Sequence, residues 1–170
     1  MNCDLCALMK GPLLYEDASI VAMLAPKPAS VGHVIVAPKQ HHVILEQVPD
    51  KIAGELFAVA NRLSIALFEG LGVQGTNVLV QNGAAAGQIT PHVRLDIIPR
   101  QENDGINLLW QPRQLSEEEM STVELRLKEA ILPLGQHEEK KEEPKPEKKE
   151  EKPLKMDDEN YLIRSLRRIP

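Results

Sequence analysis

The segment from Gln88 to Arg100 constrains the fold of this chain most, because polar and aliphatic side chains alternate along it. The polar members are His92, Arg94 and Asp96. Successive side chains of a β-strand point to opposite faces, so we expect these three on one face and the aliphatic residues between them in a core. The segment therefore predicts a strand over His92–Ile98 with a polar face that is available for a site.

Three further segments are rich in β-branched residues and bounded by Pro or Gly, which is typical of sheet strands. They are Ile20–Leu24, Val34–Ala37 and Thr76–Val80. A helix is expected from Asp50, with apolar residues at helical spacing and Gly70 and Gly72 at its end. Its apolar face consists of Ile52, Leu56, Val59, Leu63 and Leu67. This order of elements predicts an α+β meander.

The C-terminal part of the chain changes character. Ser116 and Glu119 form a capping box, which predicts a second helix from about Glu117 that Pro133 stops. Residues 134–155 are rich in Glu, Lys and Pro and predict a disordered linker. Residues 156–170 regain an amphipathic pattern over Tyr161–Pro170, which we interpret as a short helix that binds the protein's own body, a second subunit or another protein; the alternative is a disordered tail. Residues 1–133 are expected to form the folded domain.

Composition excludes several classes of function. Of 170 residues, 42% are hydrophobic, which suffices for a core. The net charge is −5, and only one Trp, two Tyr and two Phe occur, so a direct nucleic-acid partner is not expected. The chain contains no apolar run of about 18 residues, so we expect no membrane span. The start of the chain does not look like a signal peptide, so we expect a cytoplasmic protein.

Three segments of the chain, in order, carry recognisable motifs. They are Val31–His41 with Gly-His and Pro-Lys-x-His elements, Gln81–Gly83 followed by Ala86–Gln88, and His92–Arg100. These segments resemble those of the histidine triad family of nucleotide hydrolases and transferases. The resemblance extends from Cys3 to about Arg100. It implies an antiparallel half-barrel sheet with a long helix after the second core strand, and a homodimer.

The resemblance also shows what has changed in the triad. In the family, the middle histidine attacks a nucleotide's α-phosphate; its position here is Arg94, and the third histidine's position is Asp96. A guanidinium stays protonated and has no lone pair for a phosphorus centre, so covalent nucleotidyl transfer through Arg94 is excluded. Arg94 can still hold a phosphate by two charge-assisted hydrogen bonds. Alternatively it pairs with Asp96, about 7 Å along the strand.

A second departure concerns the nucleoside. The family's aspartate that accepts the ribose hydroxyls falls on Ala25, whose methyl group has no acceptor. The family residues that remain are His33, Asn82 and Gln88. With Arg94, they are the candidate residues for binding a nucleotide or phosphate ligand.

The cysteines point to a metal. Cys3 and Cys6, the only cysteines, are spaced Cys-x-x-Cys. Family members with such a pair bind zinc through it, the histidine of the Pro-Lys-x-His element and the first triad histidine. Those histidines are His41 and His92 here, with His42 as an alternative to His41. A closed shell of two thiolates and two imidazoles suits structural zinc. Read alone, the pair would be ordinary thiols or a redox pair.

Two interpretations of the function follow. The preferred one is a zinc-stabilised, catalytically degenerate histidine triad protein that serves as a nucleotide- or anion-binding module or as a protein-interaction module. The alternative is a nucleotide hydrolase or nucleotidyltransferase with a non-covalent or partner-assisted mechanism. In that case His33 would act as general base and Arg94 would stabilise charge on the phosphate. A weaker hypothesis is that Arg94 binds a phosphorylated partner.

Overall fold

The computed structural model describes residues 3–131. A first compact unit runs from Met1 to Trp110, and a second begins at Gln111. The first unit contains a five-stranded antiparallel sheet with the order β1-β2-β3-β5-β4. Its strands are β1 (Tyr15–Glu16), β2 (Ile20–Leu24), β3 (Val34–Pro38), β4 (Gly75–Leu79) and β5 (Leu95–Arg100). Its helices are α1 (Asp4–Leu8), α2 (Asp50–Leu71) and short 3-10 turns at Leu45–Gln47 and Ala84–Ala86. The expected α+β class, with an antiparallel sheet and a long helix after the second core strand, is confirmed.

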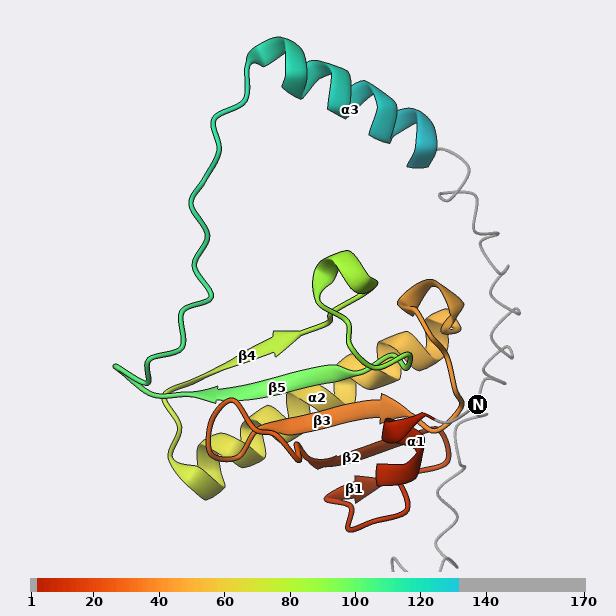
Figure 1. The fold of residues 1–170 in the computed structure, drawn as a ribbon, viewed down its shortest axis with the longest axis vertical. Coiled ribbons are helices and arrows are strands. Elements are labelled where there is room, and N and C mark those ends of the chain that lie inside the picture. Colours follow the sequence, from red (N-terminus) through yellow and green to blue (C-terminus); the bar gives the residue numbers. More distant parts are fainter. Residues whose placement is uncertain (1–2, 132–170) are drawn as a thin grey trace, which may run out of the picture. The chain divides into compact units, whose positions relative to one another are not determined.

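Helix α2 covers one face of the sheet, and α1 packs against β2 and β3 on the other face (Figure 1). One core lies between the sheet and α2 and includes Ile20, Val34, Leu56 and Ile97. A smaller cluster on the other face includes Leu5 of α1 with alternate residues of β2 and β3, such as Val21 and Ile35. Because β2 and β3 are buried on both faces, their sequences are continuous apolar runs without alternation.

Helix α2 packs one stripe against the sheet, and its buried members are Leu56, Val59, Ala60 and Leu67. The sequence predicted this stripe. It also placed Gly70 at the end of the helix, which is wrong, because Gly70 lies inside it. The helix ends at Leu71, because Gly72 takes the left-handed conformation (φ 62°) and its N–H donates to the Phe68 carbonyl. A residue without a Cβ adopts this conformation at little cost.

The second unit contains α3 (Glu117–Ile131). The predicted capping box is present: the Glu119 N–H donates to Ser116 Oγ at 3.3 Å, and the Glu119 carboxylate accepts from the Ser116 N–H at 2.8 Å. Every residue of α3 is exposed. The linker 134–155 and the segment 156–170 lie outside the described residues. Among the helices that the structure describes, none is both long and apolar enough to span a bilayer.

Three strands differ at their ends from those that the sequence predicted, and β3 differs only in that it includes Pro38. The strand expected over His92–Ile98 is β5, which begins at Leu95, and the one expected over Thr76–Val80 is β4, which begins at Gly75. The residues just before β5 bond to a loop and not to a neighbouring strand. The Val93 N–H donates to the His42 carbonyl at 2.8 Å. The alternation of side chains nevertheless extends back through this stretch. Val93 and Leu95 are in the α2-side core, whereas His92 and Asp96 lie on the other side.

Candidate functional site

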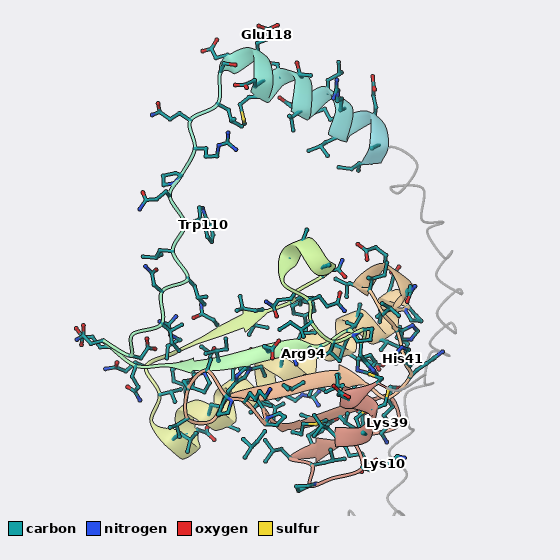
Figure 2. The ribbon with its side chains drawn as sticks, viewed as in Figure 1. Lys10, Lys39, His41, Arg94, Trp110 and Glu118 are labelled. Carbon is teal, nitrogen blue, oxygen red and sulfur yellow. The ribbon has the colours of Figure 1, made fainter. Side chains whose placement is uncertain are left out.

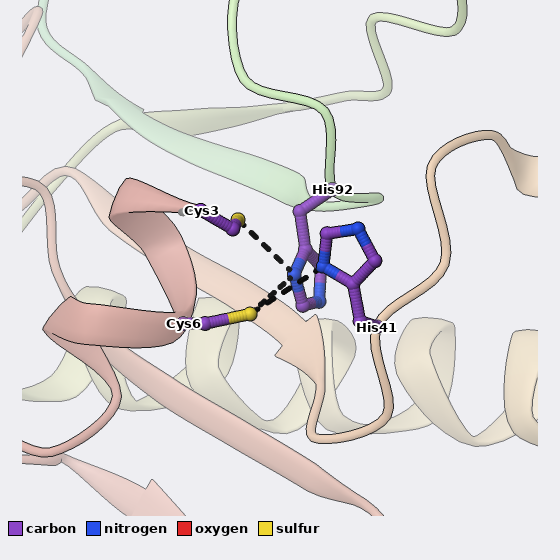
Figure 3. Close-up of side chains that lie close together, drawn as sticks. All are labelled: Cys3, Cys6, His41 and His92. Carbon is purple, nitrogen blue, oxygen red and sulfur yellow. Dashed lines mark hydrogen bonds between the residues drawn. The ribbon is translucent and has the colours of Figure 1, made fainter. Parts of the chain in front are cut away.

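Four side chains meet at one end of the sheet (Figure 3). They are Cys3, Cys6, His41 and His92, and one donor atom from each lies within 4.8 Å of all the others. The sulfur of Cys6 is 3.3 Å from His92 Nδ1 and 3.4 Å from His41 Nδ1, and the sulfur of Cys3 is 3.7 Å from His92 Nδ1. In a tetrahedral zinc site, the S–N edges measure about 3.6 Å for the usual bond lengths. The four residues therefore fit a tetrahedral metal.

The protonation of His92 is set by a neighbouring carbonyl. His92 is 1% exposed, and its Nε2–H donates to the Pro38 carbonyl oxygen at 2.9 Å. This fixes the proton on Nε2 and leaves the lone pair of Nδ1 directed at the sulfurs. Burial lowers the pKa of His92, which further favours the neutral ring. A neutral imidazole that is oriented by a backbone carbonyl is the form that binds metals.

In the absence of a cation, the surroundings of Cys6 favour its protonated thiol, which is not the form that binds a metal. Burial and the hydrogen bond with Cys3 raise the pKa of the Cys6 thiol. A bound divalent cation would reverse this, because a coordinating thiol loses its proton. A bound metal would therefore change the protonation of the cysteines more than that of His92.

Three separate elements bring the ligands together. Cys3 is the N-cap of α1 and Cys6 lies in its first turns, His41 follows β3, and His92 precedes β5. The cluster includes His41 and not His42. His42 is also buried, but it lines a different hollow with Lys39 and Ile52. Of the two histidines, the geometry places His41 in the cluster.

A cleft of about 360 Å³ lies beside the cluster, on the α1 side of the sheet. Its polar residues include His33, Arg94 and Asp96, and Lys27 and Asp4 lie in its wall. Arg94 comes immediately before β5 (Figure 2). The apolar remainder of the lining includes Leu5, Leu8, Ala25, Ile35 and Ile89. Ala25 brings only a methyl group to this wall, so the chain has no carboxylate at that position for ribose hydroxyls.

Asp96 organises the polar side of the cleft. It is 4% exposed, and it accepts a hydrogen bond from His33 Nε2 at its Oδ1 and one from Arg94 Nε at its Oδ2, each at 3.0 Å. The buried carboxylate is therefore satisfied on both oxygens. The two Nη groups of Arg94 make no hydrogen bond with any described residue, and its side chain is 30% exposed. Asp96 thus holds the Nε edge of the guanidinium, and the Nη groups are available to a ligand.

His33 has no free lone pair. Its Nδ1 accepts a hydrogen bond from the Ala29 N–H at 3.1 Å, so the proton of the neutral ring is on Nε2, where it is donated to Asp96. A general base needs a lone pair that faces the attacking water. Both ring nitrogens are occupied here, and this arrangement does not provide such a base.

The other two candidate ligand residues lie elsewhere. Asn82 accepts from the Leu45 N–H and donates to the Glu46 carboxylate. Gln88 accepts from the Gly83 N–H and donates to the carbonyls of Val43 and Thr90. Both amides join loops together, and neither lines the cleft.

Helix α1 was not expected as a cleft wall. Its residues Asp4, Leu5 and Leu8 line the cleft, although the sequence drew attention only to its cysteines. The available signal was the pattern Cys-Asp-Leu-Cys-Ala-Leu, in which leucines follow the cysteines at positions that face the same sheet.

Comparison with known proteins agrees with this geometry. A family model described as "HIT domain" matches residues 9–103, more than half of the chain. An adenylylsulfatase, HINT3, from Arabidopsis thaliana is 35% identical over 118 residues, which are 67% of this chain and 58% of that relative. The chain thus spans less than two thirds of that protein. The adenosine 5'-monophosphoramidase hnt1 of Schizosaccharomyces pombe is 30% identical over 128 residues, 72% of this chain and 93% of that enzyme.

Solved structures resemble it as well. A HIT family protein from Bacillus anthracis superposes with a TM-score of 0.70 at 29% identity, covering 76% of this chain and 97% of that one. A zinc-bound histidine triad family protein from Mycobacterium smegmatis superposes with a TM-score of 0.59 at 31% identity, covering 79% and 98%.

Proposed function

Because this chain belongs to the histidine triad family, we propose that it is a member without the covalent reaction, which binds a phosphate-containing ligand in the cleft and holds a structural zinc ion beside it. One observation carries the proposal. Arg94 stands at the position of the family's nucleophile and is fixed there by Asp96, which His33 fixes in turn. This arrangement presents to the cleft the Nη edge of a permanently protonated guanidinium, whose Nε edge pairs with Asp96, and it offers no atom that can attack phosphorus.

The ligand would be held through the free edge of Arg94. Its Nη groups can donate two parallel hydrogen bonds to an anion, since the Nε edge is already occupied. Asp96 and His33 act as positioning residues, because they restrict the guanidinium rather than touch the ligand. Nucleotides are the first class to test, since two relatives are named for reactions of adenylyl compounds. The absence of a carboxylate at Ala25 favours ligands whose anionic group contributes more to binding than the ribose.

The hydrolase alternative receives less support. It requires His33 as general base, and the ring nitrogens of His33 already bond to Ala29 and Asp96. A second subunit or a partner would have to supply the base. The protein-interaction interpretation of Tyr161–Pro170 concerns residues outside the described range and stays a prediction, and so does the cytoplasmic location.

The test of the cleft combines binding and turnover. Arg94→Gln should weaken AMP binding by about tenfold or more, because a charge-assisted pair of hydrogen bonds is lost. Lys51→Gln, at an exposed site on α2, is the matched control and should bind as the unmodified chain does. Calorimetry measures both. Incubation with an adenosine phosphoramidate and dinucleoside polyphosphates should give neither turnover nor a covalent AMP adduct, with Arg94→His plus Asp96→His run in parallel. An adduct on the unmodified chain would refute the proposal.

The zinc test uses neighbouring histidines. We expect one zinc per chain by elemental analysis, and its loss in His41→Gln and Cys6→Ser, since a structural site needs all four ligands. His42→Gln changes an adjacent buried histidine outside the cluster and should keep the metal. Equal metal content in His41→Gln and His42→Gln would contradict the assignment.

A further inference from the structure

Helix α1 belongs to two sites at once. Cys3 and Cys6 direct their sulfurs to the histidine pair, while Asp4, Leu5 and Leu8 form part of the cleft wall. The helix has only five residues, and such a short helix is not stable alone in water. Its position therefore depends on what it contacts on either side.

Few interactions other than a metal would hold this wall. Leu5 is 1% exposed and packs with Val21, Met23 and Ile35 on the sheet. The N-cap residue, Cys3, makes no side-chain capping hydrogen bond. Leu8, at the other end of the helix, is 39% exposed. Leu5 is thus the one buried residue within α1, with Met9 and Leu13 packed beside it, and the other strong attachment of the wall would be the two sulfurs.

The opposite side of the cleft is tied to the same cluster. His92 and Arg94 are two residues apart, and both precede β5. His92 is held by the Pro38 carbonyl at Nε2 and faces the two sulfurs at Nδ1, and Asp96 fixes Arg94. A metal between Cys3, Cys6 and His92 would therefore connect the α1 wall directly to the segment that carries the anion-binding guanidinium.

We infer that metal occupancy controls the cleft: with metal bound, α1 is held as a wall beside Arg94, and on metal loss α1 detaches while the sheet and α2 stay folded. Ligand binding is then metal-dependent although no ligand atom touches the metal. The inference rests on the proposed zinc and anion sites, and it adds that the two are coupled. Coupling of this kind is reciprocal, so a ligand in the cleft also retains the metal.

Amide hydrogen exchange tests the wall without a ligand. The Ala7 and Met9 amides, which donate to the Cys3 and Leu5 carbonyls at 3.1 and 3.0 Å, report on α1. After zinc is removed by a chelator, exchange in α1 should accelerate by about tenfold or more, and exchange in α2 should change by less than about twofold. Unchanged exchange in α1 overturns the inference. Loss of protection in α2 as well overturns it too, because the wall would then have no movement of its own.

A second measurement uses metal-loaded protein throughout. Zinc release to a chromogenic chelator is followed with and without saturating AMP, and we expect AMP to slow it by about threefold or more. If AMP binds and the release rate is unchanged, the coupling is refuted. If AMP fails to bind, the proposed ligand function is wrong, and amide exchange alone decides whether the metal holds the wall. Elemental analysis shows separately whether zinc binds at all.

Discussion

Arg100 and Asp104 are the centre of a polar network at the end of β5. Arg100, the last residue of β5, donates through Nε and Nη2 to both carboxylate oxygens of Asp104, at 2.6 and 2.9 Å. It also donates to Asn77 of β4 and to the Ile106 carbonyl. Asp104 accepts the N–H groups of Gln101 and Ile106. This network fixes the turn after the sheet, and the hydrogen bonds from Arg100 are the main reason that the pKa of Asp104 lies well below its usual range.

The pH dependence of Asp104 follows from this shift. Because its pKa is lower in the folded chain than in the unfolded chain, its stabilisation is present in full above about pH 5 and is lost as the pH falls below about 4. Asp104→Asn should therefore lower the urea midpoint at pH 7, and the difference from the unmodified chain should shrink on acidification. Glu102→Gln alters a carboxylate of the same turn that has no ion pair among the described residues, and it serves as the control. A constant difference between pH 7 and pH 3 would argue against the assignment.

The sequence revealed part of the residue-scale organisation. It placed Arg94 near Asp96, because residues two apart on a strand share a face, and the pair is present at 3.0 Å. It gave no sign that His33 would bond to the same carboxylate, since 63 positions separate the two residues and only the antiparallel pairing of β3 with β5 brings them together. It also retained Asn82 and Gln88 as ligand candidates on resemblance alone. Their actual partners are loop atoms, which no local pattern indicates.

At the scale of elements, the long helix was the best predicted part. Its apolar stripe has a clear period, whereas β1 is only two residues long and α1 only five, too short for any periodic signal. The late start of β5 was also not predictable. His92 and Val93 have strand-like alternation, but their backbone bonds to the His42 loop.

Gly54 inside α2 and Gly72 at its C-cap should respond in opposite ways to the same change. Gly54→Ala should stabilise the protein by about 0.5–1 kcal/mol, since the site is helical and exposed and a Cβ there meets no atom within 4 Å. Gly72→Ala should destabilise it by about 1 kcal/mol, because the end of the helix requires φ of 62°. Urea unfolding of the two variants provides the comparison. Effects of the same sign would show that the helix does not end as described.

On the scale of the whole molecule, the β4 edge of the sheet lies next to an exposed apolar face of α2 within the first unit. β4 pairs only with β5, so its other edge is unpaired among the described residues. Beside it is a groove lined by Phe57, Ile65 and Phe68 of α2 and Val78 of β4, all of them well exposed. An unpaired strand edge next to an apolar helix face is suited to a second copy of the chain. The family resemblance also predicts a homodimer.

A substitution in this groove tests the dimer. Ile65→Glu should convert a dimer into a monomer in analytical ultracentrifugation at about 10 μM, because the buried carboxylate would have no partner across the interface. Ile65 is 51% exposed in the single chain, and Leu14, at 54%, is an exposed aliphatic residue outside the groove. Leu14→Glu should therefore leave the dimer intact. A monomeric unmodified chain at this concentration would contradict the prediction.

The stretch from His92 to Ile97 sends its even-numbered side chains to the metal cluster and the cleft and its odd-numbered ones to the core under α2. Replacing an even-numbered residue alters chemistry and leaves the packing in place, as arginine and aspartate at 94 and 96 illustrate. Inserting or deleting one residue would instead exchange the two sets and bury charge where aliphatic groups belong. Single substitutions at the even-numbered positions are therefore compatible with the fold, whereas insertions and deletions in this segment are not.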